Sequence, residues 1–156
     1  MGVSNDRVSG TVEIDRSICG IDENRRPGEA ERPFWTDLPV DAGPVQVSHG
    51  TVLVRSEAQA HDVEVTLETG AELSEPLGAE FELLGEWPYR SGSGDLVVCT
   101  IEGPEFSFAV PADSRFLLRV FRSGGATVAA RFDELTGHQY PITGLEAYHF
   151  LFVPQA

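Results

Sequence analysis

The residues from 96 to 122, LVVCTIEGPEFSFAVPADSRFLLRVFR, decide the fold class of this chain. They contain three short segments with the pattern of β-strands, Leu96–Ile101, Phe106–Val110 and Arg115–Arg122. The first segment is almost continuously apolar, whereas the other two place large apolar residues at alternate positions, as strands with one buried face do. Turns that contain proline separate the three segments, which is typical of antiparallel sheets.

Similar segments lie on both sides of this stretch. Alternating or apolar runs occur at Val8–Ile14, Val45–Val47, Thr51–Arg55, Asp62–Glu68, Glu80–Trp87 and Tyr148–Val153. We expect Thr51–Arg55 and Asp62–Glu68 to form an antiparallel pair. Ser123-Gly124-Gly125 predicts a tight hairpin with Thr127–Phe132 as its return strand, and only Asp133–His138 has a briefly helical pattern. The sequence therefore predicts an all-β fold, an antiparallel β-sandwich of about eight to nine short strands with a long N-terminal loop.

The length of 156 residues is that of one domain, so we expect a single β-sandwich domain over residues 1–156. Within it, Gly20–Thr36 is highly charged and has no apolar periodicity, which predicts a surface loop. No stretch reaches the roughly 20 apolar residues of a membrane-spanning helix. The N-terminus lacks the basic and apolar regions of a secretory signal, so we expect a cytoplasmic protein.

The charge balance restricts the class of partner. The chain has 25 acidic residues against 11 basic ones, a net charge of −14, and every base is an arginine. Binding to nucleic acid or to an anionic membrane requires cations, so neither is an expected partner. A basic protein is an expected partner, because complementary charge accelerates association and selects partners. The alternative is that the acidity only provides solubility or reflects the host.

The familiar catalytic motifs are missing from the sequence. It has no Walker loop, no GxSxG elbow and no HExxH pair, so we expect no enzyme activity, no cofactor and no metal. Cys19 and Cys99 belong to no zinc motif and are expected to be reduced thiols. His149 alternates with Tyr148 and Phe150, and we therefore expect it to face solvent.

The middle of the chain resembles the competence protein J family. Trp35-Thr36-Asp37 is followed by Gly50-x-Val52-x-Val54 and then by the strand Asp62–Glu68. The block from Leu96 to Arg122, with a Phe-Ser-Phe strand that ends in proline, is similar to the penultimate region of the family. The resemblance covers roughly Trp35–Arg122. It implies a small all-β protein and, because the founding type binds and inhibits a DNA-entry nuclease, an inhibitor or immunity-type protein that blocks a basic nuclease or toxin.

This hypothesis selects tryptophans that stand beside acids. Carboxylates would take the place of DNA phosphates, and an aromatic anchor would supply binding energy. The candidate partner-binding residues are Trp35 with Asp37, Trp87 with Glu86, and the dense acidic stretch of Glu72, Glu75, Glu80 and Glu82. The alternative for both tryptophans is a place in the core.

Two other binding functions are compatible with the sequence. A carbohydrate- or small-ligand-binding β-sandwich would use Trp87, Tyr89 and Tyr140 as stacking platforms, which requires them to be exposed together on one sheet face. A calcium-dependent module would use the acidic loops, although none has the ligand spacing of a dedicated calcium loop.

Overall fold

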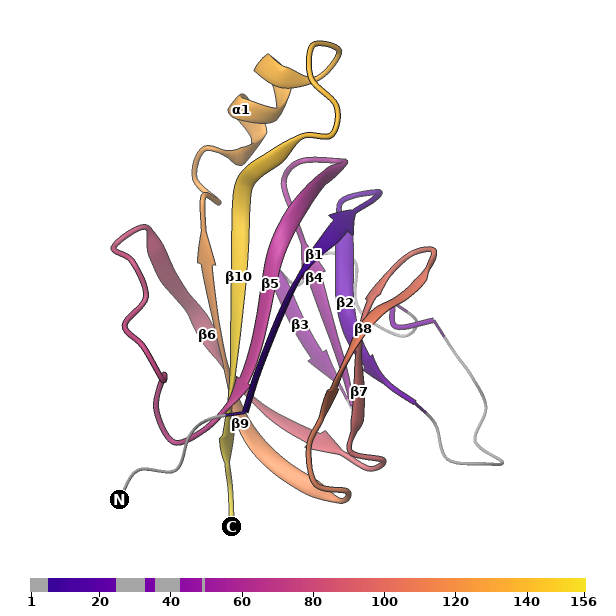
Figure 1. The fold of residues 1–156 in the computed structure, drawn as a ribbon, viewed down its shortest axis with the longest axis vertical. Coiled ribbons are helices and arrows are strands. Elements are labelled where there is room, and N and C mark those ends of the chain that lie inside the picture. Colours follow the sequence, from indigo (N-terminus) through magenta and orange to yellow (C-terminus); the bar gives the residue numbers. More distant parts are fainter. Residues whose placement is uncertain (1–5, 25–32, 36–42, 49) are drawn as a thin grey trace.

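The computed structural model describes residues 6–24, 33–35, 43–48 and 50–156 (Figure 1). In these residues ten strands and one helix follow one another along the chain. They are β1 (Asp6–Ile14), β2 (Ile18–Glu23), β3 (Val45–Ser48), β4 (Thr51–Arg55), β5 (His61–Thr69), β6 (Phe81–Ser91), β7 (Asp95–Thr100), β8 (Gly103–Ala109), β9 (Ser114–Ser123), α1 (Val128–Leu135) and β10 (Thr143–Pro154). Among the described residues, no helix has the length and apolar character needed to span a membrane.

The strands form two sheets of five. We call the sheet with the order β1-β5-β10-β9-β6 sheet A, and the sheet with the order β3-β4-β2-β7-β8 sheet B. Neighbouring strands are antiparallel except β5 and β10, which run parallel. The predicted β-sandwich is therefore confirmed, with one parallel pair inside sheet A.

The core lies between the sheets and follows from the alternation in the sequence. Tyr148, Phe150 and Phe152 of β10 point inward from the centre of sheet A and are fully buried. Phe152 packs edge-on against Tyr89 at a centroid distance of 5.3 Å. Alternate apolar side chains of sheet B, such as those of Val52 and Val54, close the same cluster from the other side.

The predicted pairing of Thr51–Arg55 with Asp62–Glu68 is wrong. The first segment is β4, which pairs with β2 and β3 in sheet B, whereas the second is β5 in sheet A, beside β1 and β10. Both segments have a buried apolar face, and a sandwich can place two such faces opposite each other across the core as well as side by side. In this chain the two apolar faces lie opposite each other across the core.

The predicted return strand Thr127–Phe132 is also wrong, because these residues begin helix α1. Alanines at positions 129 and 130 favour a helix, and Val128, Phe132 and Leu135 recur at the helical spacing. This apolar stripe packs on Ala58, Ile142 and Leu145. The helix covers the end of sheet A that lies away from the chain termini (Figure 1).

The expected surface loop Gly20–Thr36 is shorter than predicted. Its first four residues belong to β2, where Gly20 and Ile21 are buried. Ile21 reaches the core while Asp22 points to the opposite face, so the alternation is present but interrupted by glycine and charge. Of the remainder, Asn24 and residues 33–35 are described, and 25–32 and 36 lie outside the described residues.

Candidate functional site

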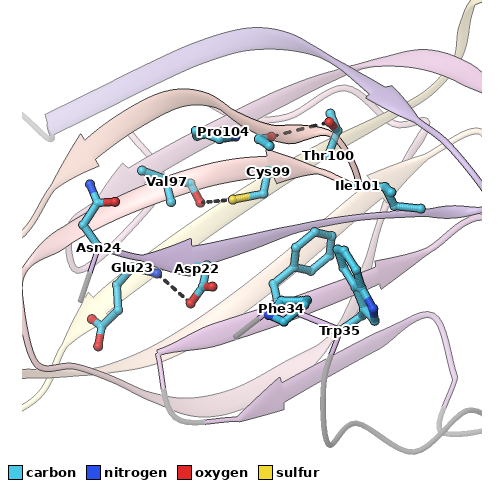
Figure 2. A pocket seen from close by; sticks show the side chains of 12 residues that line it. Asp22, Glu23, Asn24, Phe34, Trp35, Val97, Cys99, Thr100, Ile101 and Pro104 are labelled. Atoms are coloured by element: carbon cyan, nitrogen blue, oxygen red, sulfur yellow. Dashed lines mark hydrogen bonds between the residues drawn. The ribbon is translucent and has the colours of Figure 1, made fainter. Parts of the chain in front are cut away.

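A groove on the outer face of sheet B presents an exposed tryptophan (Figure 2). Phe34 packs on Leu53 of β4 and on Val97 and Cys99 of β7, in a small apolar cluster separate from the core. Trp35 stands edge-on to Phe34, with ring centroids 5.1 Å apart and an angle of 85° between the rings. Phe34 is only 4% exposed and Trp35 is 39% exposed. Phe34 thus anchors this segment, and Trp35 is left available for contact.

A glycine in β2 makes room for the Phe34 ring. A Cβ atom at Gly20 would lie 2.5 Å from the ring and 2.5 Å from the backbone oxygen of Val52. Both distances are far below van der Waals contact, so only glycine allows Phe34 to lie this close to sheet B.

The groove has an apolar wall and an acidic end. Its volume is about 470 Å³, and Ile101 of the turn between β7 and β8 and Pro104 of β8 line it. Asp22 lines it from β2, where its Oδ1 accepts hydrogen bonds from the backbone N–H of Glu23 at 2.9 Å and from Oγ1 of Thr51 at 3.3 Å. These bonds hold the carboxylate in place beside the apolar surface.

The Cys99 thiol in the groove is not suited to nucleophilic chemistry. Burial raises its pKa to about 11, and the nearby carboxylate of Asp22 contributes to the rise. A thiol with such a pKa is almost entirely protonated at neutral pH, and the nucleophile would be the thiolate. The groove is therefore equipped to bind and not to react through sulfur.

Carboxylates gather next to this groove, where β1 of sheet A meets β8 of sheet B. We call this group the β1–β8 acidic cluster; it consists of Glu13, Asp15, Asp62, Glu102 and Glu105. Partial burial, followed by the charges of the other four residues, raises the pKa of Glu13 above its usual value. Every one of those charges is a carboxylate, so this surface concentrates negative charge.

The groove and the acidic cluster share the turn between β7 and β8. Ile101 of this turn and Gly103 and Pro104 at the start of β8 line the groove. Glu102 and Glu105, from the same short stretch of chain, are exposed and belong to the cluster. An exposed aromatic ring and a dense group of carboxylates therefore lie on adjoining surfaces.

The predicted acidic stretch lies elsewhere, on sheet A and the segment before it. Two of its members have an arginine partner: Glu82 bonds Arg122 at 2.7 Å, and Glu75 lies 4.0 Å from Arg7. Glu86, which was predicted to act with Trp87, lies 3.5 Å from Arg119. Glu72 and Glu80 are exposed on the segment between β5 and β6. The structure does not bring this stretch together with Trp35, because the two lie on different sheets.

The remaining predicted residues are placed as follows. Trp87 is half-buried and packs against the main core, which is the alternative weighed for it from the sequence. Asp37 lies outside the described residues. The expected stacking platform is not assembled, since Tyr89 is only 2% exposed and donates its hydroxyl proton to the backbone oxygen of Gly50.

A buried polar network contains a serine, a histidine and a glutamate. Ser56 Oγ donates to Oε1 of Glu146 at 2.5 Å, and Nε2 of His61 lies 3.0 Å from the same serine oxygen. Tyr148 donates its hydroxyl to the other carboxylate oxygen at 3.0 Å. In a hydrolytic triad the acid orients the histidine through Nδ1. Here Oε1 of Glu146 accepts the hydrogen bond of the serine hydroxyl directly and lies 3.4 Å from Nε2 of His61, whereas Nδ1 has no hydrogen-bond partner. This geometry satisfies a buried carboxylate and does not activate a nucleophile.

Within the described residues, no group of three or more histidines, cysteines and acids is arranged to hold a metal ion. The two cysteines are separate, free and buried. Cys19 belongs to the main core and Cys99 to the Phe34 cluster, so their side chains point to opposite faces of sheet B.

Sequence reasoning missed the β1–β8 acidic cluster. Its members come from three separate parts of the chain, around residues 13–15, at 62 and at 102–105. The available signal was the outward position of Glu13 and Asp62 in two alternating strands. That signal becomes informative only when β1 is known to pair with β5 and to lie beside β8.

Neither a protein-family model nor a curated protein sequence matches the chain, but solved structures share its fold. ComJ from Bacillus subtilis, described as an inhibitor of the DNA-degrading activity of NucA, superposes with a TM-score of 0.64 at 11% identity. That match covers 98% of this chain and 100% of ComJ. A protein described as crocagin biosynthetic gene J matches with a TM-score of 0.57 at 14% identity, over 99% of this chain and 100% of its own. The chain therefore has the fold of ComJ over almost its whole length, beyond the part in which the sequence resembles that family.

Proposed function

We propose that this chain is an inhibitor that binds a DNA-degrading enzyme and covers its DNA-binding surface, without catalysing a reaction itself. The observation that carries the proposal is the exposed Trp35 beside the β1–β8 acidic cluster. The fold shared with ComJ, an inhibitor of the DNA-degrading activity of NucA, supports it. A nuclease neutralises phosphates with cationic side chains, so its DNA-binding surface is complementary to a cluster of carboxylates.

The two parts of this surface would contribute differently. Trp35 would supply the desolvated contact that anchors the complex, as tryptophans commonly do at protein interfaces. The carboxylates would attract the basic enzyme over a distance and occupy the positions of DNA phosphates. The acidic residues of β6 are weaker candidates, because arginines already neutralise Glu82 and Glu86.

We also propose a cytoplasmic location. Two buried cysteines that stay reduced fit a reducing compartment. Fractionation of the host cells, with the chain detected by antibody, tests this location directly.

The test of function is inhibition of DNA cleavage. The chain is titrated into NucA, and in parallel into any nuclease encoded beside its own gene, with plasmid DNA as substrate. We expect activity against at least one of them to fall linearly to an end point at one chain per nuclease. A chain that leaves both enzymes fully active would contradict the proposal.

Variants then locate the surface. Trp35→Ala and the pair Glu102→Gln/Glu105→Gln should each weaken the complex at least tenfold, or about 1.4 kcal/mol. The pair Glu75→Gln/Glu80→Gln removes the same charge from the segment before β6, and it should change affinity less than twofold. If this control weakens the complex as much as the test pair, inhibition stands but the assigned surface is wrong.

A further inference from the structure

The groove beside Trp35 runs along strand β7 on the outer face of sheet B (Figure 2). Its floor contains Val97 and Cys99, which alternate on the outward face of this strand. Pro104 of β8 lies beside Cys99 in the pairing of the two strands and lines the groove on that side. Phe34 and Trp35 line it on the side of β2, the other neighbour of β7. The groove therefore follows the direction of a strand between apolar walls.

The length of the groove corresponds to a short extended segment. Asn24, whose backbone N–H donates to the backbone oxygen of Asp95, lines one end. Gly103, which pairs with Thr100, lines the other. The six residues of β7 from Asp95 to Thr100 span about 20 Å. An extended segment of about five or six residues matches this length.

The end of the groove nearest Asn24 carries negative charge. Asp22 lines it, and Asp95 lies on the same outward face of β7 as Val97, which follows two residues later. The side-chain amide of Asn24 donates to Oδ2 of Asp95 at 2.7 Å. An amide is a neutral donor, so this bond orients the Asp95 carboxylate and leaves its charge in place.

The opposite end of the groove is acidic as well. Glu102 and Glu105 are exposed and lie beside Gly103 and Pro104 in the chain, which line the groove. Among the described residues, neither of these glutamates nor Asp95 forms an ion pair with an arginine. The described residues that line the groove include no arginine either. An occupant with an apolar centre and a positive charge toward each end complements this surface.

We propose that the groove holds an extended segment of the partner protein, with an apolar side chain at its centre and a basic residue toward each end. The proposal rests on the proposed function for the existence of a protein partner, and it specifies the part of that partner that meets Trp35. The apolar side chain packs against Trp35 and the floor of the groove, where exclusion of water favours binding. The basic side chains lie near Asp95 at one end and near Glu102 at the other.

The experiment is a titration of the full chain, labelled with ¹⁵N, by the peptide acetyl-Arg-Gly-Phe-Gly-Arg-amide. The chain has two tryptophans, and the variant Trp35→Phe assigns the indole N–H resonance of Trp35. We expect a saturable shift of this resonance, with a much smaller change at Trp87, which packs against the main core. The absence of a saturable shift at Trp35 would overturn the proposal.

Two further peptides test the chemistry of the occupant. Acetyl-Gln-Gly-Phe-Gly-Gln-amide lacks the positive charges, and acetyl-Arg-Gly-Gly-Gly-Arg-amide lacks the apolar centre. Each should bind at least tenfold more weakly than the first peptide. Equal affinity of the glutamine peptide would indicate an apolar ligand of no particular charge, and equal affinity of the glycine peptide would indicate diffuse attraction. Either result would contradict the occupant assigned to the groove.

A pair of variants tests the location. Ile101→Lys places a positive charge in the groove, where it repels the basic residues of the peptide, and should weaken binding at least tenfold. Leu83→Lys is the matched control, because it gives the same charge to an apolar side chain that is 44% exposed on β6. It should leave affinity within twofold, and melting curves show that both variants are folded. Equal losses in the two variants would remove the groove as the binding site.

These titrations contain no nuclease, so they separate the groove from the proposed function. If the peptide does not bind while the chain still inhibits a nuclease, the occupant of the groove is wrong and the inhibitor function stands. If the peptide binds to a chain that inhibits no nuclease, the groove is supported and the inhibitor function is contradicted.

Discussion

Cys19 and Cys99 illustrate how position sets the chemistry of a single side chain. Both thiols are buried, and burial raises the pKa of Cys19 to about 12 and that of Cys99 to about 11. The carboxylate of Glu146 adds to the rise at Cys19, as that of Asp22 does at Cys99. The sequence predicted reduced thiols but could not place them on opposite faces of sheet B.

We expect both thiols to resist a disulfide reagent in the folded protein at pH 8. Less than about one thiol in a hundred would be ionised, and both sulfurs are shielded. Ellman's reagent should release two equivalents only after denaturation, with Cys99 the faster of the two under native conditions because it is 8% exposed against 2% for Cys19. Rapid reaction of both thiols in the native chain would contradict this expectation, and a Cys19→Ser variant assigns the faster one.

His149 was expected to face solvent, and that expectation was wrong. It does point away from the core, but it is 3% exposed and lies 2.6 Å from Oε1 of the buried Glu68. The segment after β5 covers this pair, and the backbone N–H of Ser74 donates to the same carboxylate. Alternation predicted the face correctly, but it could not show that a later segment would cover it.

The environment of His149 predicts a pH dependence of stability. Burial lowers its pKa below the usual 6.5, although the hydrogen bond and charge of Glu68 oppose the shift. The unfolded chain therefore binds a proton near pH 6.5 that the folded chain does not, and stability falls as the pH drops from 7 toward the folded pKa. His149→Gln, which keeps a donor for Glu68, should show a shallower fall in the free energy of unfolding between pH 7 and 5.

The exposed His138 supplies the control for this measurement. Chemical denaturation of His138→Gln across the same range should reproduce the slope of the unmodified chain. An unchanged slope in His149→Gln would remove His149 as the cause.

At the scale of elements, the position of the Phe34 ring against sheet B depends on glycine at position 20, which has no side chain. Gly20→Ala should displace the ring and destabilise the fold by about 1–3 kcal/mol, as overpacking does. It should also alter the fluorescence of Trp35, which rests against Phe34. Urea denaturation and acrylamide quenching measure the two effects.

Gly92→Ala is the matched control, because a Cβ there would meet only a Glu23 oxygen at an ordinary 3.6 Å. Equal stability losses in the two variants would show that the close approach of Phe34 does not require glycine at position 20.

Strands with a strong alternation of apolar and polar residues were predictable from the sequence. Elements whose structure depends on the residues packed around them were not. Val8–Ile14, Phe106–Val110 and Arg115–Arg122 became β1, β8 and β9, with bounds shifted by a few residues. Thr127–Phe132 was misjudged because a glycine pair suggested a hairpin, whereas alanines and a helical stripe favoured α1. β2 was missed since glycine and charges interrupt its short alternation.

At the scale of the whole molecule, the sequence predicted the sandwich but not which strands share a sheet. Apolar faces show that a strand has a buried side, and they do not show whether its neighbour lies beside it or across the core. The acidic cluster was hidden for the same reason, because it exists only where β1 and β8 meet. The sequence did single out Trp35 as a candidate anchor, because a tryptophan close to an acidic residue is a plain signal, and the structure leaves its side chain 39% exposed.

The measurement closest to the central claim is the association rate of the chain with the nuclease proposed as its partner, followed by stopped-flow fluorescence across a range of salt. With a net charge of −14 and a local cluster of carboxylates, we expect the rate to fall at least tenfold between about 20 and 300 mM salt, while dissociation changes little. Glu102→Gln/Glu105→Gln should flatten this dependence. A rate that is unaffected by salt in the unmodified chain would contradict the claim that an acidic surface docks onto a cationic one.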